Sequence, residues 1–296
     1  MAVLVGPDTR LLVQGLGRDG SFQASRTREY GTNMVAAVHP GRNGQKFENT
    51  IPYFSTVARA VEDTGANTGV IFVPAPFAMD AMIEQIDAGI ELVVCITEGV
   101  PVLDMVKVMA YIKNKPSRLI GSNCPGVLSP AYKTRVGIVP GNIAQAGNVG
   151  VVSRSGTLTY EAIAQLVQNG MGQSTCVGIG GDPIKGANFI DLLSRFEKDD
   201  ETDGVVLIGE IGGSDETNAG TWIQENLSKP VVAFIAGKTA PKGKRMGHAG
   251  AIIGGADDTA QAKIDALRNC GVTVSDSPAG IGEVMAEALG ICATTN

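Results

Sequence analysis

The chain has 296 residues, of which 44% are hydrophobic and 18% are charged, and its formal net charge is −6. This length predicts about two domains. The acidic balance argues against a nucleic-acid-binding surface, which would be basic. It still permits phosphate ligands, because backbone N–H groups at a helix start bind anions without cationic side chains.

Cysteine usage and the amino-terminal residues bear on the compartment. The five cysteines form no closely spaced pair, and their number is odd. This usage is typical of a reducing compartment and matches no common metal site. The chain shows no basic segment before a long apolar run and no stretch of about 18 apolar residues. We therefore expect a cytoplasmic protein without membrane contact, or a mitochondrial or other organellar matrix protein if a transit peptide has been removed.

Short apolar runs alternate with helical patterns in the first half of the chain. This alternation predicts an α/β fold with a parallel, doubly wound sheet, in which ligands bind at the carboxyl ends of the strands. The strands are predicted at 11–14, 34–38, 69–73, 92–96 and 118–120, and the helices at 55–63, 79–88 and 103–113.

The second half of the chain repeats this scheme. The segment 122–148 between the halves contains prolines and glycines and no convincing helix. We therefore predict a first domain over 1–122, a linker over 123–146 and a second domain over 147–296. Strands of the second domain are predicted at 149–152, 175–178, 205–208, 231–235 and 272–274, and helices at 156–168, 189–196, 216–227, 260–269 and 281–289.

A glycine-rich turn follows the first predicted strand. Residues 15–20 read Gly-Leu-Gly-Arg-Asp-Gly, open a helical segment and fit the pattern G-x-G-x-x-G. Such glycines let the backbone approach a pyrophosphate at a helix start, although they also suit a merely structural turn. An NAD site would need an acidic residue about 20 residues further on. The chain has Arg42 there instead, which favours a phosphorylated nucleotide such as coenzyme A (CoA).

Two further strand ends carry polar residues. Thr97 and Glu98 follow the strand at 92–96, and either bind a ligand or cap the next helix. Ser155 and Gly156 stand at the start of the helix at 156–168, where free N–H groups and the helix dipole favour an anion. The alternative for Ser155 is simple N-capping. An esterase-type serine is disfavoured, because the motif G-x-S-x-G is absent.

His248 is one of two histidines and lies in the glycine-rich segment 237–250. Little bulk shields its imidazole, and a neutral imidazole nitrogen is a competent nucleophile. Glu210 follows the strand at 205–208, between glycines. A carboxylate there can accept a hydrogen bond from one ring nitrogen and free the other as the nucleophile. Each residue alone would more often be an ordinary loop residue.

Together these residues identify a family. Residues 154–161 read Arg-Ser-Gly-Thr-Leu-Thr-Tyr-Glu, residues 177–183 read Val-Gly-Ile-Gly-Gly-Asp-Pro, and both precede the His248 segment. Over essentially its whole length the chain resembles the alpha subunits of succinyl-CoA synthetase (succinate–CoA ligase). The resemblance implies a Rossmann-like CoA-binding domain followed by a flavodoxin-like, doubly wound ligase domain that carries a phosphohistidine.

The resemblance also implies an activity and roles for individual residues. Succinyl-CoA would form reversibly from succinate, CoA and ATP or GTP, through an acyl phosphate and a phosphohistidine at His248. Glu210 would orient His248, Ser155 and Gly156 would hold the phosphoryl oxygens, and Tyr160 would contact the substrate. The CoA contacts implied are Gly17, Arg18, Asp19, Arg42, Ile96, Thr97 and Glu98.

A partner is implied as well. The nucleotide and Mg²⁺ would belong to an ATP-grasp beta subunit, in a heterodimer or a dimer of heterodimers, and no metal site is expected on this chain. The absence of a Walker A pattern agrees with this division.

The CoA half departs from the family's usual sequence. The first glycine-rich loop is one residue shorter and lacks a threonine, and Gln23 stands where a histidine is usual. His39 and Arg42 replace a threonine and a lysine, and Ser122 replaces a proline. These changes bear on the CoA contacts, whereas the segments around Ser155 and His248 keep the family pattern.

Three alternatives remain open from the sequence. The small subunit of malate–CoA ligase shares the histidine segment, and no residue of this chain excludes malate. A non-catalytic CoA-binding regulator would use the first domain alone, which leaves His248 unexplained. An NAD-dependent dehydrogenase is disfavoured by the missing acid after the second strand.

Overall fold

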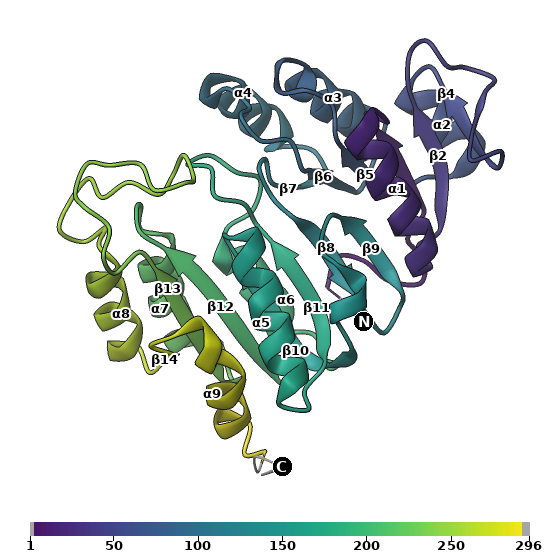
Figure 1. Ribbon diagram of the computed structural model, residues 1–296. Helices are drawn as coiled ribbons and strands as arrows, with labels where there is room; N and C mark the ends of the chain where they lie inside the picture. Colours follow the sequence, from purple (N-terminus) through teal and green to yellow (C-terminus); the bar gives the residue numbers. More distant parts are fainter. Residues whose placement is uncertain (1–2, 292–296) are drawn as a thin grey trace.

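Two seven-stranded sheets form the scaffold of this computed structural model, which describes residues 3–291 (Figure 1). The amino-terminal part of the chain, purple to blue in Figure 1, builds the first sheet, and the remainder, teal to yellow, builds the second. Strands in the middle of both sheets are buried along their whole length. This is expected of parallel strands that are covered on both faces.

The first sheet is made of β1 Leu11–Gln14, β2 Met34–Val38, β3 Lys46–Phe47, β4 Ile51–Phe54, β5 Thr68–Ile71, β6 Leu92–Cys95 and β7 Arg118–Ile120. Its helices are α1 Arg18–Tyr30, α2 Val57–Thr64, α3 Ala75–Asp87 and α4 Val102–Ile112. The strand order is β3-β4-β2-β1-β5-β6-β7, and β3 is antiparallel to β4. The parallel strands, counted along the chain, therefore follow the order 3-2-1-4-5-6 of the Rossmann fold.

The second sheet is made of β8 Gly126–Ser129, β9 Thr134–Gly137, β10 Ala146–Ser153, β11 Gln173–Gly178, β12 Gly204–Glu210, β13 Val231–Ala236 and β14 Thr273–Val274. Its helices are α5 Gly156–Gln168, α6 Phe189–Glu197, α7 Asp215–Asn226, α8 Ala260–Asn269 and α9 Ile281–Ala288. Its order is β14-β13-β12-β10-β11-β8-β9. The parallel strands β10 to β14 thus follow the flavodoxin-like order 2-1-3-4-5.

The segment between the halves differs from the linker predicted at 123–146. It holds the hairpin of β8 and β9, and β8 pairs antiparallel with β11, so these residues belong to the second sheet. A short 3₁₀ helix, Gly141–Ile143, leads into β10. Strands of four residues carry little periodic signal, and their partner lies far along the chain, which explains why the sequence did not reveal them.

Most other elements lie within a few residues of their predicted ranges. Helix α3 shows the largest shift, because it begins at Ala75 where the sequence predicted a start at 79. Pro74 is its N-cap and a second proline lies in its first turn. Proline is tolerated there because the first N–H groups of a helix have no intrahelical partner.

The two sheets share one hydrophobic core. Side chains alternate along β1, so that Leu12 packs under α2, α3 and α4 while Leu11 and Val13 face the other way. On that other side they join Val127 of β8 and Val177 of β11 in a single cluster. In the second domain α5 packs against α9, while α6, α7 and α8 form a row on the opposite face (Figure 1). Within residues 3–291 every helix is too short or too polar to span a lipid bilayer.

Candidate active site

Each sheet has one point where the strand order reverses. In the first sheet β1 lies between β2 and β5, and in the second β10 lies between β11 and β12. At such a switch point the connections leave in opposite directions, so a crevice opens at the carboxyl ends of the strands, where ligands bind. Most of the predicted functional residues lie at these two crevices.

The first crevice is a cavity of about 780 Å³. Its lining includes Gly17, Arg18 and Asp19 at the start of α1, and Arg42 after β2. Gly17 is the N-cap of α1 and has no side chain, so the free N–H groups of the first helical turn face a ligand unobstructed. Arg42 lies over the ring of Tyr53, with its Nη1 donating to the phenol oxygen at 3.2 Å.

Two of the loop's glycines serve packing. Gly15 has φ +96°, and a Cβ there would lie 2.5 Å from the backbone nitrogen of Val73. A Cβ at Gly20 would lie 2.1 Å from the carbonyl oxygen of Gly15. Because neither glycine has a Cβ, α1 can lie close against the ends of β1 and β5. Gly17, by contrast, has no atom within 4 Å of a built Cβ, so its side faces the cavity.

The predicted strand-tip residues separate in the structure. Ile96 and Thr97 do not line the first cavity, and Thr97 Oγ1 donates to the carbonyl oxygen of Val73 at 2.7 Å, which ties two strand ends together. Glu98 lines a second cavity of about 260 Å³. Arg245 and Ala249, which flank His248 in the chain, line the same cavity. The second cavity therefore lies between the first domain and the histidine loop.

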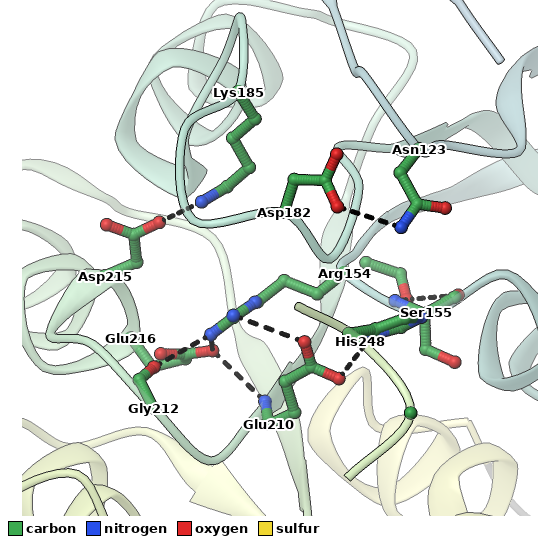
Figure 2. Close-up of polar contacts among 12 residues, drawn as sticks. Asn123, Arg154, Ser155, Asp182, Lys185, Glu210, Gly212, Asp215, Glu216 and His248 are labelled. Carbon is green, nitrogen blue, oxygen red and sulfur yellow. Dashed lines mark hydrogen bonds and ion pairs between the residues drawn. The ribbon is translucent and has the colours of Figure 1, made fainter. Parts of the chain in front are cut away.

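Glu210 and His248 meet at the second switch point. Glu210 ends β12, is 7% exposed, and its Oε2 lies 2.7 Å from Nδ1 of His248 (Figure 2). The hydrogen bond to Glu210 raises the pKa of His248, against the opposing effect of burial. Since the carboxylate engages Nδ1, the remaining ring nitrogen, Nε2, is the one left for a reaction partner.

Close backbone packing holds the histidine loop in place. The N–H of Gly250 donates to the carbonyl oxygen of Gly181 at 3.0 Å. A Cβ at Gly181 would lie 2.2 Å from Cγ of His248. The loop after β11 is held in turn by Asp182, whose carboxylate accepts hydrogen bonds from Ser122 Oγ at 2.7 Å and Asn123 Nδ2 at 3.0 Å.

Glu210 belongs to a buried network of ion pairs. Arg154 lies at its centre, with Nη2 3.2 Å from Glu210 Oε1 and Nη1 3.0 Å from Glu216 Oε1 (Figure 2). The fully buried Lys263 pairs with the other oxygen of Glu216 and also donates to the carbonyl oxygens of Glu210 at 2.8 Å and Gly212 at 2.7 Å. Two cations and two carboxylates thus balance in charge.

The pKa shifts in this network follow from burial and pairing. Burial lowers the pKa of Arg154, but the carboxylates of Glu216 and Glu210 more than offset it, so its pKa is raised overall. Burial dominates at Lys263 and lowers its pKa despite Glu216. Arg154 therefore stays charged beside the carboxylates of Glu210 and Glu216.

Ser155 is the N-cap of α5, and its Oγ accepts a hydrogen bond from the N–H of Leu158 at 3.3 Å. Its own N–H donates to Ser153 Oγ at 3.0 Å. The capping alternative for Ser155 is therefore what the structure shows, and its backbone N–H is not free. Gly156 opens the helix, and the N–H groups of this first turn have no intrahelical partner.

Tyr160 lies one turn further along α5 and is half-buried, which raises the pKa of its phenol. Its hydroxyl lies 3.8 Å from the position that a Cβ at Gly156 would take. The side chain therefore stands beside the start of the helix.

Several residues of this site were not singled out from the sequence. They are Arg154, Gly181, Asp182, Glu216 and Lys263. The first three lie in the family segments 154–161 and 177–183, and this was the only indication of a role that the sequence offered. Glu216 and Lys263 lie on predicted helices, where a charged residue usually points to solvent.

No metal centre is apparent in this part of the chain. Among residues 3–291, no three His, Cys, Asp or Glu side chains gather in a way that could hold an ion.

Comparisons with known proteins place these features in a class. Residues 7–99 match the CoA binding domain family, and residues 152–273 match the CoA-ligase family. The fold and site are thus those of a CoA ligase built on two doubly wound sheets.

Curated relatives narrow the class. The succinate–CoA ligase [ADP-forming] subunit alpha of Aquifex aeolicus is 56% identical over 292 residues, which cover 98% of this chain and 95% of the relative. That of Staphylococcus epidermidis is 53% identical over 289 residues, or 97% and 95% of the two chains. The chain belongs to the family of succinate–CoA ligase alpha subunits.

Solved structures share the fold. ATP citrate lyase from Methanothrix soehngenii, in complex with citrate and coenzyme A, has a TM-score of 0.86 at 28% identity, covering 98% of this chain and 51% of the lyase. The chain therefore spans about half the length of that protein. A dinucleotide-forming acetyl-coenzyme A synthetase from Ca. Korarchaeum cryptofilum, at 20% identity and a TM-score of 0.72 over 91% of this chain and 58% of its own, shares the fold alone.

Proposed function

We propose that this chain is the alpha subunit of a succinate–CoA ligase and that it carries the phosphoryl group on His248. The relatives of more than 50% identity bear that name. The observation that carries the residue assignment is the 2.7 Å contact between Glu210 and His248 at the second switch point. The reaction is the reversible formation of succinyl-CoA from succinate and CoA, driven by a nucleoside triphosphate.

The Glu210 contact defines which nitrogen reacts. A carboxylate accepts, so Nδ1 of His248 carries the proton and Nε2 carries the lone pair. Nε2 attacks the terminal phosphorus of the triphosphate, and the diphosphate leaves. The phosphorylated ring is a cation while Nδ1 keeps its proton, and the Glu210 carboxylate stabilises that charge. The succinate carboxylate then takes the phosphoryl group, the CoA thiolate attacks the resulting acyl phosphate, and phosphate is released.

The start of α5 is proposed to hold phosphoryl oxygens. The N–H groups of its first turn and the helix dipole favour negative charge, and Ser155 and Gly156 open this turn. Tyr160 stands beside it and is proposed to contact the substrate.

CoA is assigned to the first crevice. Gly17, Arg18, Asp19 and Arg42 line a cavity of about 780 Å³, large enough for a nucleotide. We propose that the reactive arm of CoA then passes over Ile96 and Thr97 into the cavity lined by Glu98 and Arg245. That cavity is lined by residues of the histidine loop, so the thiol would arrive beside His248.

The remaining components are assigned to a partner. No described cluster of side chains suits a metal, so Mg²⁺ and the nucleotide are proposed to be held by an ATP-grasp beta subunit, in a heterodimer or a dimer of heterodimers. ATP is proposed over GTP because the relatives are named ADP-forming. The free thiols of Cys95, Cys124, Cys176 and Cys270 suit the cytoplasm.

The experiment is phosphorylation with labelled ATP or GTP of the chain co-expressed with its beta subunit. We expect an acid-labile, base-stable label on the wild type and none on the variant His248→Asn. Chasing the label with CoA plus succinate or malate identifies the acid, and succinate should release it faster. CoA binding by His248→Asn, measured in parallel, shows whether the variant is folded.

Three results would contradict the proposal. Absence of label on an assembled, folded wild-type complex would remove the phosphohistidine step. Full activity of His248→Asn would favour the non-catalytic CoA-binding regulator, and faster release by malate would favour malate–CoA ligase.

A further inference from the structure

A separate cavity lies where the two domains meet, away from both crevices. It has a volume of about 290 Å³ and is lined by residues between α4 and β7 of the first domain and by α6 of the second. None of its lining residues lines the first crevice or the second cavity, which Glu98 and Arg245 line. A Cβ at Gly186 would lie 2.3 Å from the carbonyl oxygen of Leu119, so the domains touch at this point.

The cavity carries a surplus of positive charge. Arg118 comes from the first domain and Arg195 from the second, and Lys113 and Lys115 line the cavity as well. Lys115 pairs with Asp87. Within residues 3–291 the side chains of Arg118, Arg195 and Lys113 make no ion pair and no hydrogen bond. Burial and the charge of Arg118 lower the pKa of Arg195, and the charge of Asp191 opposes this in part. Two arginines without an ion-pair partner that line one small cavity favour an anion between them.

One carboxylate lines the cavity but is already engaged. Asp191 Oδ2 accepts a hydrogen bond from the N–H of Asn188 at 3.0 Å, as part of the capping box that begins α6. It lies beyond the 4.0 Å limit of an ion pair with either arginine. The cavity's cations therefore outnumber its anions.

Ser117 provides an independent sign of a ligand. The residue lines the cavity and is 7% exposed, yet its Oγ is buried without a hydrogen-bond partner. An unsatisfied buried hydroxyl destabilises the folded state, and such groups are uncommon in native proteins. A ligand oxygen in the cavity would accept the hydrogen of this hydroxyl.

We propose that this cavity binds a phosphate dianion, with Arg118 and Arg195 as the charged donors and Ser117 as a neutral one. The planar fork of each guanidinium donates two hydrogen bonds to a tetrahedral oxyanion. Because one arginine belongs to each domain, the bound anion bridges them and stabilises their present arrangement. The site is independent of the proposed phosphoryl transfer. Its ligand is either free phosphate or the phosphate group of a small metabolite.

The test is calorimetric titration of inorganic phosphate into the full-length chain at constant ionic strength in chloride. The wild type should bind one equivalent that the double variant Arg118→Gln/Arg195→Gln binds at least tenfold more weakly. The matched control is Lys198→Gln, which removes an exposed cation at the end of α6 outside the cavity. The control should bind as the wild type does. Any binding of phosphate at the start of α5 should be the same in all three proteins.

Ser117→Ala keeps the test decisive if the double variant does not fold. Without phosphate its melting temperature should equal or exceed that of the wild type, because an unsatisfied group is removed. Its phosphate affinity should fall about threefold to tenfold. Glycerol 3-phosphate in a second titration separates the two sources: tighter binding than phosphate indicates a metabolite, and weaker binding indicates the free ion.

Two outcomes overturn the proposal. One is phosphate binding by the double variant equal to that of the wild type. The other is a lower melting temperature of unliganded Ser117→Ala, since the hydroxyl would then have a partner within the protein.

Discussion

Both crevices of the molecule lie where the strand order of a sheet reverses, but they differ in how their side chains are held. Within residues 3–291 the side chains of Arg18 and Asp19 of the first crevice make no hydrogen bond or ion pair, and that of Arg42 hydrogen-bonds to Tyr53 and lies over its ring. Around His248, in contrast, charged groups are locked into a buried network. A ligand-binding surface can keep its donors free for the ligand, whereas a reacting group needs an environment that is organised beforehand.

Glu210→Gln tests the organised crevice most directly. The amide can donate toward Nδ1 of His248, which favours the tautomer with the proton on Nε2 and blocks attack. We expect phosphorylation of His248 to slow by about 10³-fold, with CoA binding unchanged. Glu62→Gln is the matched control, since that carboxylate pairs with Arg59 on the exposed face of α2, outside both crevices. Equal losses in both variants would contradict the assignment of Glu210.

The same contact predicts a pH dependence. The hydrogen bond that His248 Nδ1 donates to Glu210 raises the pKa of His248, so Nε2 is protonated and unreactive below that pKa. Phosphorylation by the wild type should rise with pH through the raised pKa, and in Glu210→Gln this rise should move to lower pH. The stabilising effect of the contact has the opposite trend: it is complete below the unfolded pKa, about 6.5, and is lost as the pH rises through the folded one. NMR titration of the His248 imidazole measures its folded-state pKa in the wild type and in Glu210→Gln.

Lys263→Met tests the buried charges. It leaves Glu216 short of a partner and removes a donor from two buried carbonyl oxygens. We expect a loss of about 3 kcal/mol in the free energy of unfolding, measured by denaturant titration. Lys238→Met breaks an exposed pair with Asp276 and should cost much less, because solvent screens such a pair. A loss at Lys263 no larger than at Lys238 would show that the network does not stabilise the fold.

Gly181→Ala tests the packing of the histidine loop. The new Cβ would lie 2.2 Å from Cγ of His248, so the imidazole must move by more than 1 Å. Displacements of this size can slow a reaction by about 10²-fold, and we expect that reduction in the phosphorylation rate. Gly6→Ala is the control, because no atom lies within 4 Å of its Cβ. Unchanged phosphorylation in Gly181→Ala would mean that the histidine loop can shift without loss of its function.

Arg42→Ala tests the open crevice and should have the smallest effect. Loss of one charged donor should weaken CoA binding about tenfold and leave phosphorylation of His248 unchanged. Arg59→Ala, on the exposed face of α2, is the control. Calorimetry with CoA measures both variants. An unaltered affinity in Arg42→Ala would move the phosphate contacts of CoA to the helix start at Gly17 and Arg18.

Patterns in the sequence predicted much of this arrangement. Alternating apolar runs predicted the two doubly wound sheets, and the glycine-rich turn, the cap at Ser155 and the strand end at Glu210 lay where they were expected. Each of these signals is local, because it depends on periodicity and on the groups left free where a strand or helix ends. The pairing of Glu210 with His248 was also expected, although 38 residues separate them.

Other features depended on the tertiary structure. The hairpin at β8 and β9 is a pair of strands only because β11 offers it an edge. Lys263 is fully buried only because Glu216 and two carbonyl oxygens surround it, and the nearest of these partners along the chain is 47 residues away. The sequence by itself determined most of the elements and singled out Glu210 and His248. Folding alone decided which charges are buried together, because a buried charge is tolerated only where distant segments supply its partners.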